Sequence, residues 1–382
     1  MPNKKSIAFV CATNYHIIVS YFLRSFFKDY KKILIINKSS FDALVLFDSI
    51  KQSNHWDEVI GIESDLKKIS LSNIFIKFYN HFLLRTKIKK IIKNNNISEV
   101  VVFTMGDIIS NFFSGSNLLK KIYLGEDGMY PYIGGIEVFD SKKTIKNTIK
   151  KFFFKEFFID FKDRIDELIL LKPNLFNPIF DSKKKNIKNG GINSEQLKAV
   201  FTELNTVFSY SHHEIYKEVD VIFFDSAMIS KELDVEIEQF EYTFKLLSNI
   251  FPKNKKILIK MSRYATKYKI ESYNRLKQQY ENIYIDYANL NTPWEIIYFN
   301  NLDNLKNATL ASYWSGACLT PYLLFNIEND IVILSKFLLN HKGISSEYES
   351  IINSFINFSE KINDDFEHKS IYFPTKKAPI HI

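Results

Sequence analysis

The chain has 382 residues and a mass of 44.9 kDa, with 46% hydrophobic and 25% charged residues. This composition excludes a disordered or fibrous protein and supplies enough apolar residues for two hydrophobic cores. The net charge of +8 favours an anionic partner: a nucleic acid, a phosphate-bearing small molecule or an acidic membrane surface. The two cysteines, Cys11 and Cys318, stand far apart in apolar surroundings, which argues against a disulfide framework or a cysteine-based zinc site and fits a reducing compartment.

The N-terminal apolar stretch, residues 7–12, is too short for a signal peptide. No uninterrupted apolar run approaches the roughly 20 residues that a membrane-spanning helix needs. We therefore expect a cytoplasmic protein, and peripheral attachment to the inner face of the cell membrane stays open.

Short apolar runs rich in β-branched and aromatic residues recur along the chain. Each is followed by a longer stretch with helical spacing, a pattern typical of parallel α/β sheets. The predicted strands are residues 7–12, 32–36, 99–103 and 121–124 in the first half, and 221–224, 256–259, 283–285, 308–312 and 331–334 in the second. The pattern predicts two α/β units.

Two segments separate these units. Residues 141–172 are a very basic insert whose pattern favours helix. Residues 183–191 are rich in lysine, asparagine and glycine and are predicted to be an exposed loop. We place an N-terminal Rossmann-like domain at 1–205, with the insert at about 141–191, and a C-terminal Rossmann-like domain at 206–382.

The first candidate motif is Gly125-Glu126-Asp127-Gly128, directly after the strand predicted at 121–124. In open α/β sheets, ligands bind beyond the carboxyl ends of the strands, and glycines let the backbone turn sharply there. Two adjacent carboxylates push one pKa upward, which makes that group a usable proton acceptor near neutral pH. Glu126 and Asp127 are therefore candidate catalytic residues. The alternative is an acidic turn that caps the next helix.

A second motif follows the strand predicted at 308–312, where Ser312, Ser315 and Gly316 precede a predicted helix. Hydroxyl groups and free backbone N–H groups at a helix N-terminus are suited to bind a phosphate. An ordinary N-cap explains the same residues without any ligand.

Two further candidate groups lie at equivalent positions. Lys260 and Arg263 follow the strand predicted at 256–259 and are suited to pair with a phosphate or carboxylate. Glu295 lies in the first turn of a helix predicted after Pro293, where a carboxylate can accept both hydroxyls of a ribose. Without a ligand, the basic pair is explained as solvated surface charge. Glu295 is explained by the attraction between a carboxylate and the N-terminal end of the helix dipole.

From residues 9–16 to about Leu334, the chain resembles the bacterial GT-B sialyltransferases, and most closely the lipooligosaccharide sialyltransferase family GT52. Those enzymes carry an acidic D/E-D-G motif, a His-Pro motif and a serine-rich motif, in this order. Residues 126–128 match the first, residues 312–320 match the last, and residues 293–295 stand where the family has its acidic nucleotide-contacting helix start. Where the family has Pro-His-Pro-Arg, this chain has Lys260-Met261-Ser262-Arg263, so the histidine that supports the departing cytidine monophosphate is absent.

The resemblance implies a GT-B fold, with two Rossmann-like domains that face each other across a cleft. It also implies an inverting glycosyltransferase that moves sialic acid or a related nonulosonic acid from its CMP form to a bacterial surface glycan, lipooligosaccharide or capsule. The partners would be this CMP-activated sugar and an oligosaccharide or glycolipid acceptor. By resemblance, Asp127 is the general base, with Glu126 beside it. Ser312 and Ser315 would stabilise the departing phosphate, and Lys260 or Arg263 would replace the missing positive charge. Glu295 would hold the ribose, and Asn14 and His16 would line the facing side of the cleft.

A departing monophosphate carries less charge than a diphosphate, so a helix dipole, serines and a basic side chain are expected to stabilise it without a metal ion. No Asp-X-Asp follows a predicted strand and the histidines lack a metal-ligand spacing, so we expect neither a metal nor a cofactor. The missing histidine keeps two alternatives open: a UDP- or GDP-sugar donor, and a non-catalytic glycan-binding protein.

The insert interleaves lysines with aromatic residues: Lys142, Lys143, Lys146, Lys150, Lys151 and Lys155 with Phe152, Phe153, Phe154, Phe157, Phe158 and Phe161. Such a helix fits an anionic bilayer, with lysines at the headgroups and phenylalanines below them. A helix that packs its phenylalanines on the N-terminal sheet fits the pattern as well. Nucleic-acid binding is disfavoured, because the basic residues are dispersed and the chain carries no recognised nucleic-acid module.

Overall fold

The computed structural model describes residues 4–64, 74–104, 106–129, 131–133, 164–176, 186–191, 193–225, 233–263, 265–339 and 346–375. The chain divides into two compact units, Met1–Ser209 and Tyr210–Ile382. The boundary predicted from the sequence lies between 205 and 206. Most of the basic insert, with its lysines and phenylalanines, lies outside the described residues, so its membrane, core and nucleic-acid interpretations stay predictions.

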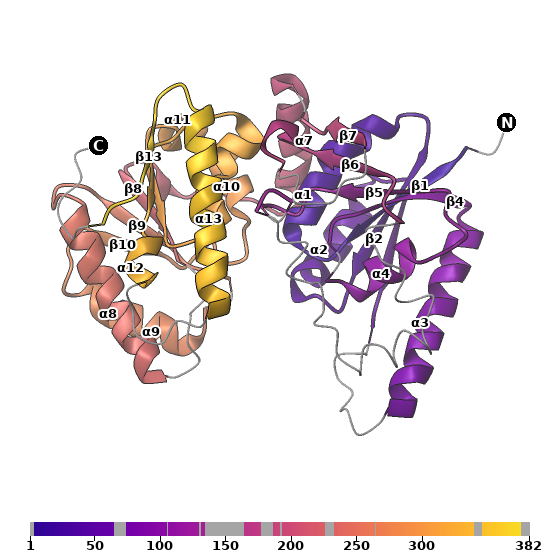
Figure 1. The fold of residues 1–382 in the computed structure, drawn as a ribbon, viewed down its shortest axis with the longest axis horizontal. Coiled ribbons are helices and arrows are strands. Elements are labelled where there is room, and N and C mark those ends of the chain that lie inside the picture. Colours follow the sequence, from indigo (N-terminus) through magenta and orange to yellow (C-terminus); the bar gives the residue numbers. More distant parts are fainter. Residues whose placement is uncertain are drawn as a thin grey trace. The chain divides into compact units, whose positions relative to one another are not determined.

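Unit 1 is built on a parallel sheet whose described strands run in the order β3-β2-β1-β4-β5-β6-β7 (Figure 1). The strand order reverses between β1 and β4, and doubly wound sheets bind ligands beyond the carboxyl ends of the strands at such a reversal. β1 is buried along its whole length, which explains its continuous apolar sequence. The strands are β1 (Ser6–Cys11), β2 (Lys31–Asn37), β3 (Glu58–Ile62), β4 (Ile97–Val102), β5 (Lys121–Gly125), β6 (Glu167–Leu170) and β7 (Asn186–Asn189).

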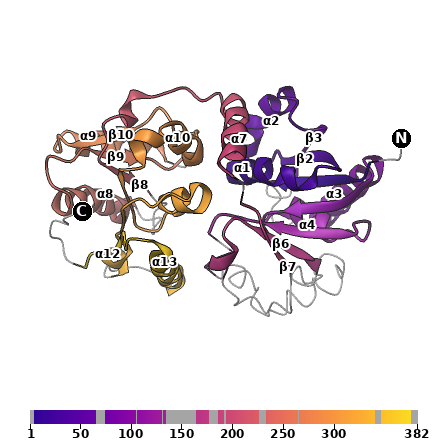
Figure 2. The same cartoon turned by 90° about the horizontal axis from the view of Figure 1, so that it is seen from above.

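Helices cover both faces of this sheet. In Figure 2 α1, α2 and α7 gather on one face, whereas α3 and α4 contact each other and β4. Side-chain caps fix the starts of three helices: Thr13 accepts from the His16 N–H at α1, Asp107 from the Ser110 N–H at α4, and Asn193 from the Gln196 N–H at α7. The helices are α1 (Asn14–Leu23), η1 (Arg24–Phe27), α2 (Phe41–Gln52), α3 (Ile74–Asn94), α4 (Ile108–Ser114), η3 (Pro173–Leu175) and α7 (Ser194–Val207).

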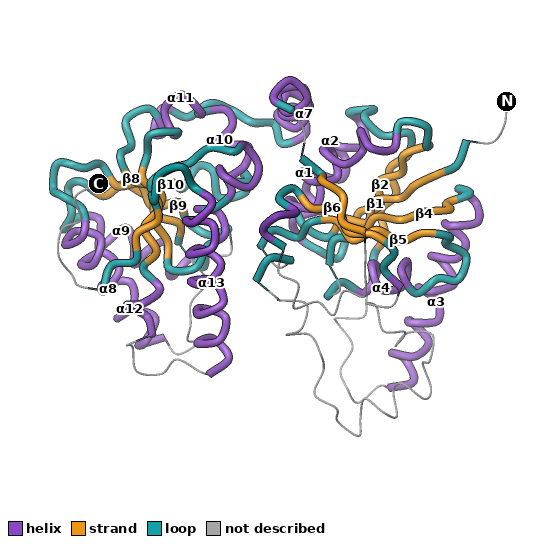
Figure 3. The backbone as a smooth tube through the Cα atoms, turned by 45° about the horizontal axis from the view of Figure 1, so that its top comes forward, coloured by secondary structure: helices purple, strands orange, loops and turns teal. Residues whose placement is uncertain are grey.

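Unit 2 repeats the same plan with a second parallel sheet, whose described strands run in the order β10-β9-β8-β11-β12-β13. Here the order reverses between β8 and β11. The strands are β8 (Val221–Phe224), β9 (Ile257–Lys260), β10 (Ile283–Asp286), β11 (Thr309–Ser312), β12 (Ile331–Ile333) and β13 (Ile371–Tyr372). In Figure 3 the strands of each unit lie between layers of helices.

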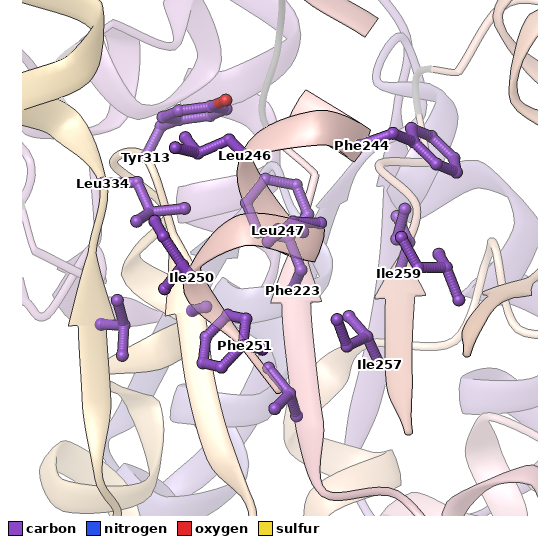
Figure 4. Packing of buried hydrophobic residues seen from close by; sticks show 14 of the residues in the cluster. Phe223, Phe244, Leu246, Leu247, Ile250, Phe251, Ile257, Ile259, Tyr313 and Leu334 are labelled. Carbon is purple, nitrogen blue, oxygen red and sulfur yellow. The ribbon is translucent and has the colours of Figure 1, made fainter. Parts of the chain in front are cut away.

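The alternation of side chains along β8 divides the core of unit 2 into two layers. Phe223 points to one face and joins Leu247 and Ile250 of α8 in a large buried cluster (Figure 4). Phe224 points to the other face and meets Trp294 edge-on, with ring centroids 4.8 Å apart. The helices of unit 2 are η4 (Glu214–Tyr216), α8 (Leu233–Ile250), α9 (Lys267–Lys277), α10 (Trp294–Asn300), α11 (Leu302–Leu305), η5 (Gly316–Cys318), the π-helix η6 (Pro321–Phe325), α12 (Ser335–Leu339) and α13 (Ser346–Asp365).

All the predicted strands form, with ends shifted by one or two residues at most, and the helix predicted after Pro293 begins at Trp294. Two predictions were wrong. β6 lies inside the segment predicted to be helical. The strand has only four residues, three of them apolar, and such a short run in a basic segment is too little to predict a strand. β7 lies inside the predicted loop at 183–191. All four of its residues are exposed at the sheet edge, so they show no hydrophobic alternation. β3 and β13 were not predicted.

The helix predicted after Ser315 was also wrong in kind. The chain forms the short 3-10 turn η5 and then the π-helix η6. Pro321 explains the break, because proline has no N–H to donate to the preceding turn. Among the residues that the structure describes, no helix is both long enough and apolar enough to cross a membrane.

Candidate functional site

Glu126 follows β5 and is completely buried. Its Oε1 accepts from the Tyr15 hydroxyl at 2.8 Å, and its Oε2 accepts from the Leu171 N–H at 2.8 Å and from the Tyr132 hydroxyl. Burial raises the pKa of Glu126 to about 7, although these three hydrogen bonds oppose the shift, and the charge of Asp127 adds to it. Glu126 therefore ties the loop after β5 to the start of α1 and to the end of β6.

Asp127 points away from this enclosure, and a quarter of its side chain is exposed. Its Oδ1 lies 2.8 Å from Nε2 of His16, whose side chain is 1% exposed. The backbone N–H of Ala12 donates to Nδ1 of His16 at 3.2 Å, so the neutral ring carries its proton on Nε2 and donates it to Asp127. The sequence placed both residues beyond strand ends, and the structure brings them into contact.

The surroundings of this pair fix its geometry. The His16 ring stacks on Phe103 at 5.1 Å, with the planes 16° apart, and Phe103 in turn leaves no room for a side chain at Gly125. Gly128 has φ +56°, a conformation that glycine adopts without strain, so the acidic pair is followed by a turn that few other residues allow. Asn14 begins α1 beside His16, and its buried Oδ1 has no hydrogen-bond partner among the described residues.

In unit 2, three of the residues predicted to hold the donor lie at the end of β9, just beyond it and at the start of α10: Lys260, Arg263 and Glu295. Glu295 accepts a hydrogen bond from the Thr320 side chain and lies within the electrostatic reach of Arg263 and Lys260. Burial raises the pKa of Glu295, and the hydrogen bond and the two positive charges oppose this shift. Arg263 is exposed, so this group presents one cation to solvent beside a carboxylate.

Lys260 is held in a buried network. Its Nζ donates to the carbonyl oxygen of Asn289 at 2.6 Å and lies 3.7 Å from Oδ2 of Asp286. Asp286 also accepts from the Tyr216 hydroxyl and from the Asn289 N–H, the latter at 3.1 Å. Burial lowers the pKa of Lys260, and the charge of Asp286 opposes that shift. The ammonium group therefore joins the ends of β9 and β10 and is 7% exposed.

Ser312, Ser315 and Gly316 form the turn beyond β11. The Ser312 hydroxyl is fully buried and accepts from the Ser315 N–H at 3.1 Å, so it shapes the turn from inside. The Ser315 hydroxyl accepts from the Ala317 N–H at 3.3 Å. Ser315 and Gly316 are partly exposed and are the members of this turn that a ligand can reach.

Four groups at these sites were not predicted from the sequence: the hydroxyls of Tyr15 and Tyr132 on Glu126, the acid Asp286, and Thr320 beside Glu295. A signal existed for Asp286, because it is an acidic residue that ends a buried strand. Tyr15 contacts Glu126 across 111 residues, so no local pattern marks it. Tyr132 lies only six residues after Glu126, but it stands in a turn without the regular spacing that would indicate the contact. Within the described part of the chain, no three histidine, cysteine, aspartate or glutamate side chains are grouped as metal ligands would be.

No protein-family model matches the chain, and no curated protein matches its sequence. Solved structures do match. A protein assigned as a UDP-N-acetylglucosamine 2-epimerase from Listeria monocytogenes is 12% identical, with a TM-score of 0.53, over 94% of this chain and 89% of its own. UGT73P12 of Glycyrrhiza uralensis, in complex with glycyrrhetinic acid 3-O-monoglucuronide, is 8% identical, with a TM-score of 0.51, over 98% and 82%. At such low identity the likeness concerns the fold alone. The chain has the GT-B fold, in which two Rossmann-like α/β domains follow each other along the sequence.

Proposed function

We propose that the protein is an inverting glycosyltransferase, which moves a sugar from a nucleotide-activated donor to a hydroxyl group of a glycan and needs no metal ion. The observation that carries this proposal is Asp127, a partly exposed carboxylate beyond β5 with one oxygen fixed by a buried histidine. A carboxylate held in this way at a strand end is suited to act as a general base.

In the proposed reaction, Oδ2 of Asp127 takes the proton from the acceptor hydroxyl as its oxygen attacks the anomeric carbon. The bond between that carbon and the leaving phosphate oxygen breaks, and the configuration inverts. His16 serves as a positioning residue, because both its ring nitrogens are already engaged and its side chain is buried. Glu126 holds the loop in place from the other side.

Unit 2 would hold the donor nucleotide. We assign the phosphate to Arg263, Ser315 and the backbone of Gly316, and the ribose to Glu295. Lys260 and Ser312 would not contact the donor and would hold the surrounding loops in place, because their polar groups are enclosed and paired within unit 2. The domain roles follow: residues 1–205 serve the acceptor, and residues 206–382 serve the donor.

For the donor we propose CMP-sialic acid or a related CMP-activated nonulosonic acid, and for the acceptor a bacterial surface glycan such as lipooligosaccharide or capsule. The support is the resemblance of residues 126–128 and 312–320 to the sialyltransferase motifs. A UDP-sugar is the second candidate. Two observations favour it: Lys260 does not replace the missing histidine with a free cation, and the Listeria neighbour is assigned to a UDP-sugar substrate.

The test is incubation of the protein with a panel of CMP-, UDP- and GDP-sugars and a mixture of oligosaccharide acceptors, with mass spectrometry of the nucleotide released and the product formed. Asp127→Asn keeps the shape of the side chain and removes the base, so we expect transfer to fall by about 10²–10⁴-fold while nucleotide binding stays unchanged. His16→Gln should lower kcat less and leave KM for the donor unchanged. A chelator should leave the rate unchanged.

Asp303→Asn, at a fully exposed aspartate of α11, is the matched control and should behave as the unmodified protein. Undiminished transfer by Asp127→Asn would remove Asp127 from the mechanism. Release of UDP alone would replace the CMP donor with the second candidate. Oligosaccharide binding without any nucleotide binding would establish the non-catalytic alternative.

A further inference from the structure

Helix α3 has two different faces. Leu84, Ile88 and Ile92 recur at a spacing of four residues and are buried in unit 1. On the opposite face Tyr79 is 62% exposed, Phe82 63% and Leu83 45%. Successive residues of an α-helix are turned by about 100°, which places these three residues on one side of α3. Large apolar side chains this exposed, gathered on one helix face, are typical of an interaction surface.

The same outward face continues as a basic surface toward the C-terminal end of α3. Lys87, Lys90 and Lys93 are exposed, and the same helical spacing places them on the side of Tyr79. None of the three forms an ion pair with a described residue, and the sequence of α3 contains no acidic residue. Burial, aided by repulsion from Arg85 and Lys93, lowers the pKa of Lys89, so the basic groups of α3 are close enough to act on one another.

Figures 1 and 3 both show α3 leading away from the sheet of unit 1, with its C-terminal end beside β4. The aromatic half of the outward face therefore belongs to the part of the helix that projects. An exposed aromatic patch followed by lysines fits the interface of an anionic bilayer, because aromatic rings enter below the headgroups while lysines pair with lipid phosphates.

We propose that the outward face of α3, which consists of Tyr79, Phe82, Leu83, Lys87, Lys90 and Lys93, docks the protein on an anionic lipid bilayer. An acidic protein partner would explain the lysines. It would not explain the three exposed large side chains beside them, on a helix whose sequence contains no acidic residue. The proposal concerns attachment, and it does not depend on the donor or on glycosyl transfer. It is also separate from the prediction for the insert at 141–172.

The experiment is flotation of the full-length protein with vesicles of phosphatidylglycerol and phosphatidylethanolamine, and with vesicles of phosphatidylcholine alone. We expect binding to the anionic vesicles that weakens as salt is added. The triple variant Lys87→Gln, Lys90→Gln, Lys93→Gln should bind about 100-fold more weakly, since each lysine near an anionic surface contributes about a factor of five. Tyr79→Ser, Phe82→Ser, Leu83→Ser should lose about tenfold or more.

Matched control variants change exposed residues of the same kinds elsewhere: Lys253→Gln, Lys267→Gln, Lys277→Gln for charge, and Leu44→Ser, Val45→Ser for apolar area. Both should bind as the unmodified protein does. A second measurement reports on the face itself: Phe82→Trp should show a blue-shifted emission and quenching by brominated lipids when anionic vesicles are added.

The proposal fails if the protein does not bind anionic vesicles, or if both α3 variants bind them as well as the controls do. It also fails if the emission of the Phe82→Trp variant does not change while the protein floats, because another segment then makes the contact. Self-association that the apolar variant abolishes, without any lipid binding, would assign the same face to a second copy of the chain. Since the assay contains no nucleotide, its outcome is independent of the proposed function.

Discussion

Glu126 and Asp127 are neighbours in sequence, yet their side chains have opposite surroundings. Glu126 is enclosed by two tyrosine hydroxyls and a backbone N–H, whereas Asp127 keeps a quarter of its side chain in solvent and contacts His16. The two carboxyl groups therefore differ in environment: enclosure raises the pKa of Glu126, whereas Asp127 is open to solvent.

Glu126 makes the stability of unit 1 depend on pH. Its pKa in the folded protein, about 7, lies above its ordinary value of 4.5, so between these values the folded state binds more protons than the unfolded state. This contribution is fully present below pH 4.5 and is lost as pH rises through 7. We expect Glu126→Gln to remove it, a difference on the order of 3 kcal/mol between pH 4 and pH 8.

The measurement is urea unfolding of both proteins across this pH range, followed as the difference between them. Glu241→Gln, at an exposed glutamate of α8, is the control and should change the difference little. Parallel pH profiles for Glu126→Gln and the unmodified protein would contradict the assignment.

At the scale of the elements, the candidate residues lie where strands end. The loop after β5 carries the acidic pair, the start of α1 carries the histidine, and Phe103 after β4 supports the histidine ring. Because β1, β4 and β5 are adjacent and parallel, their carboxyl ends reach the same edge of the sheet and bring distant segments together.

Gly125 is packed directly against one of these residues, Phe103. A Cβ there would lie 2.6 Å from Cε1 of Phe103, and Phe103 is buried against His16. We expect Gly125→Ala to destabilise unit 1 by about 1–3 kcal/mol and to lower kcat, because the displaced ring moves His16. Denaturant unfolding and turnover with the donor found active measure the two effects.

Gly106→Ala is the control for this substitution. Its Cβ would meet only Oγ1 of Thr104, at 3.7 Å, which is an ordinary contact. Similar losses of stability in the two variants would show that the packing against Phe103 is not the cause.

At the scale of the whole molecule, each unit has its own sheet and its own buried core. We therefore expect thermal unfolding in separable transitions. Leu247→Ala, in the core of unit 2, should destabilise its transition by about 2–5 kcal/mol, and Leu34→Ala in β2 should do the same for unit 1. The donor nucleotide at about 100 times its Kd should raise the unit 2 transition by about 2.7 kcal/mol.

Calorimetry of the two variants, with and without nucleotide, assigns the binding unit. A nucleotide that raises the transition lowered by Leu34→Ala, and leaves the other unchanged, would contradict the assignment of the donor to unit 2.

The sequence by itself determined the plan of the molecule. Buried strands in parallel sheets are apolar on both faces, so they can be recognised in the sequence as continuous apolar runs, such as residues 7–12 and 221–224. The acidic or hydroxyl residues that follow such runs indicate the strand ends. The short strand β6 and the exposed edge strand β7 have no such pattern and could not be predicted. They form because they pair with neighbouring strands of the sheet.

Only the tertiary structure decided which residues meet. The contact of His16 with Asp127 and that of Tyr15 with Glu126 both span 111 residues, a separation over which no local pattern records a partner. It also decided that Lys260 and Ser312 are enclosed while Arg263 and Ser315 reach solvent. Burial depends on the packing of elements from the whole unit, and this packing sets both the charge state of a carboxyl group and its access to a substrate.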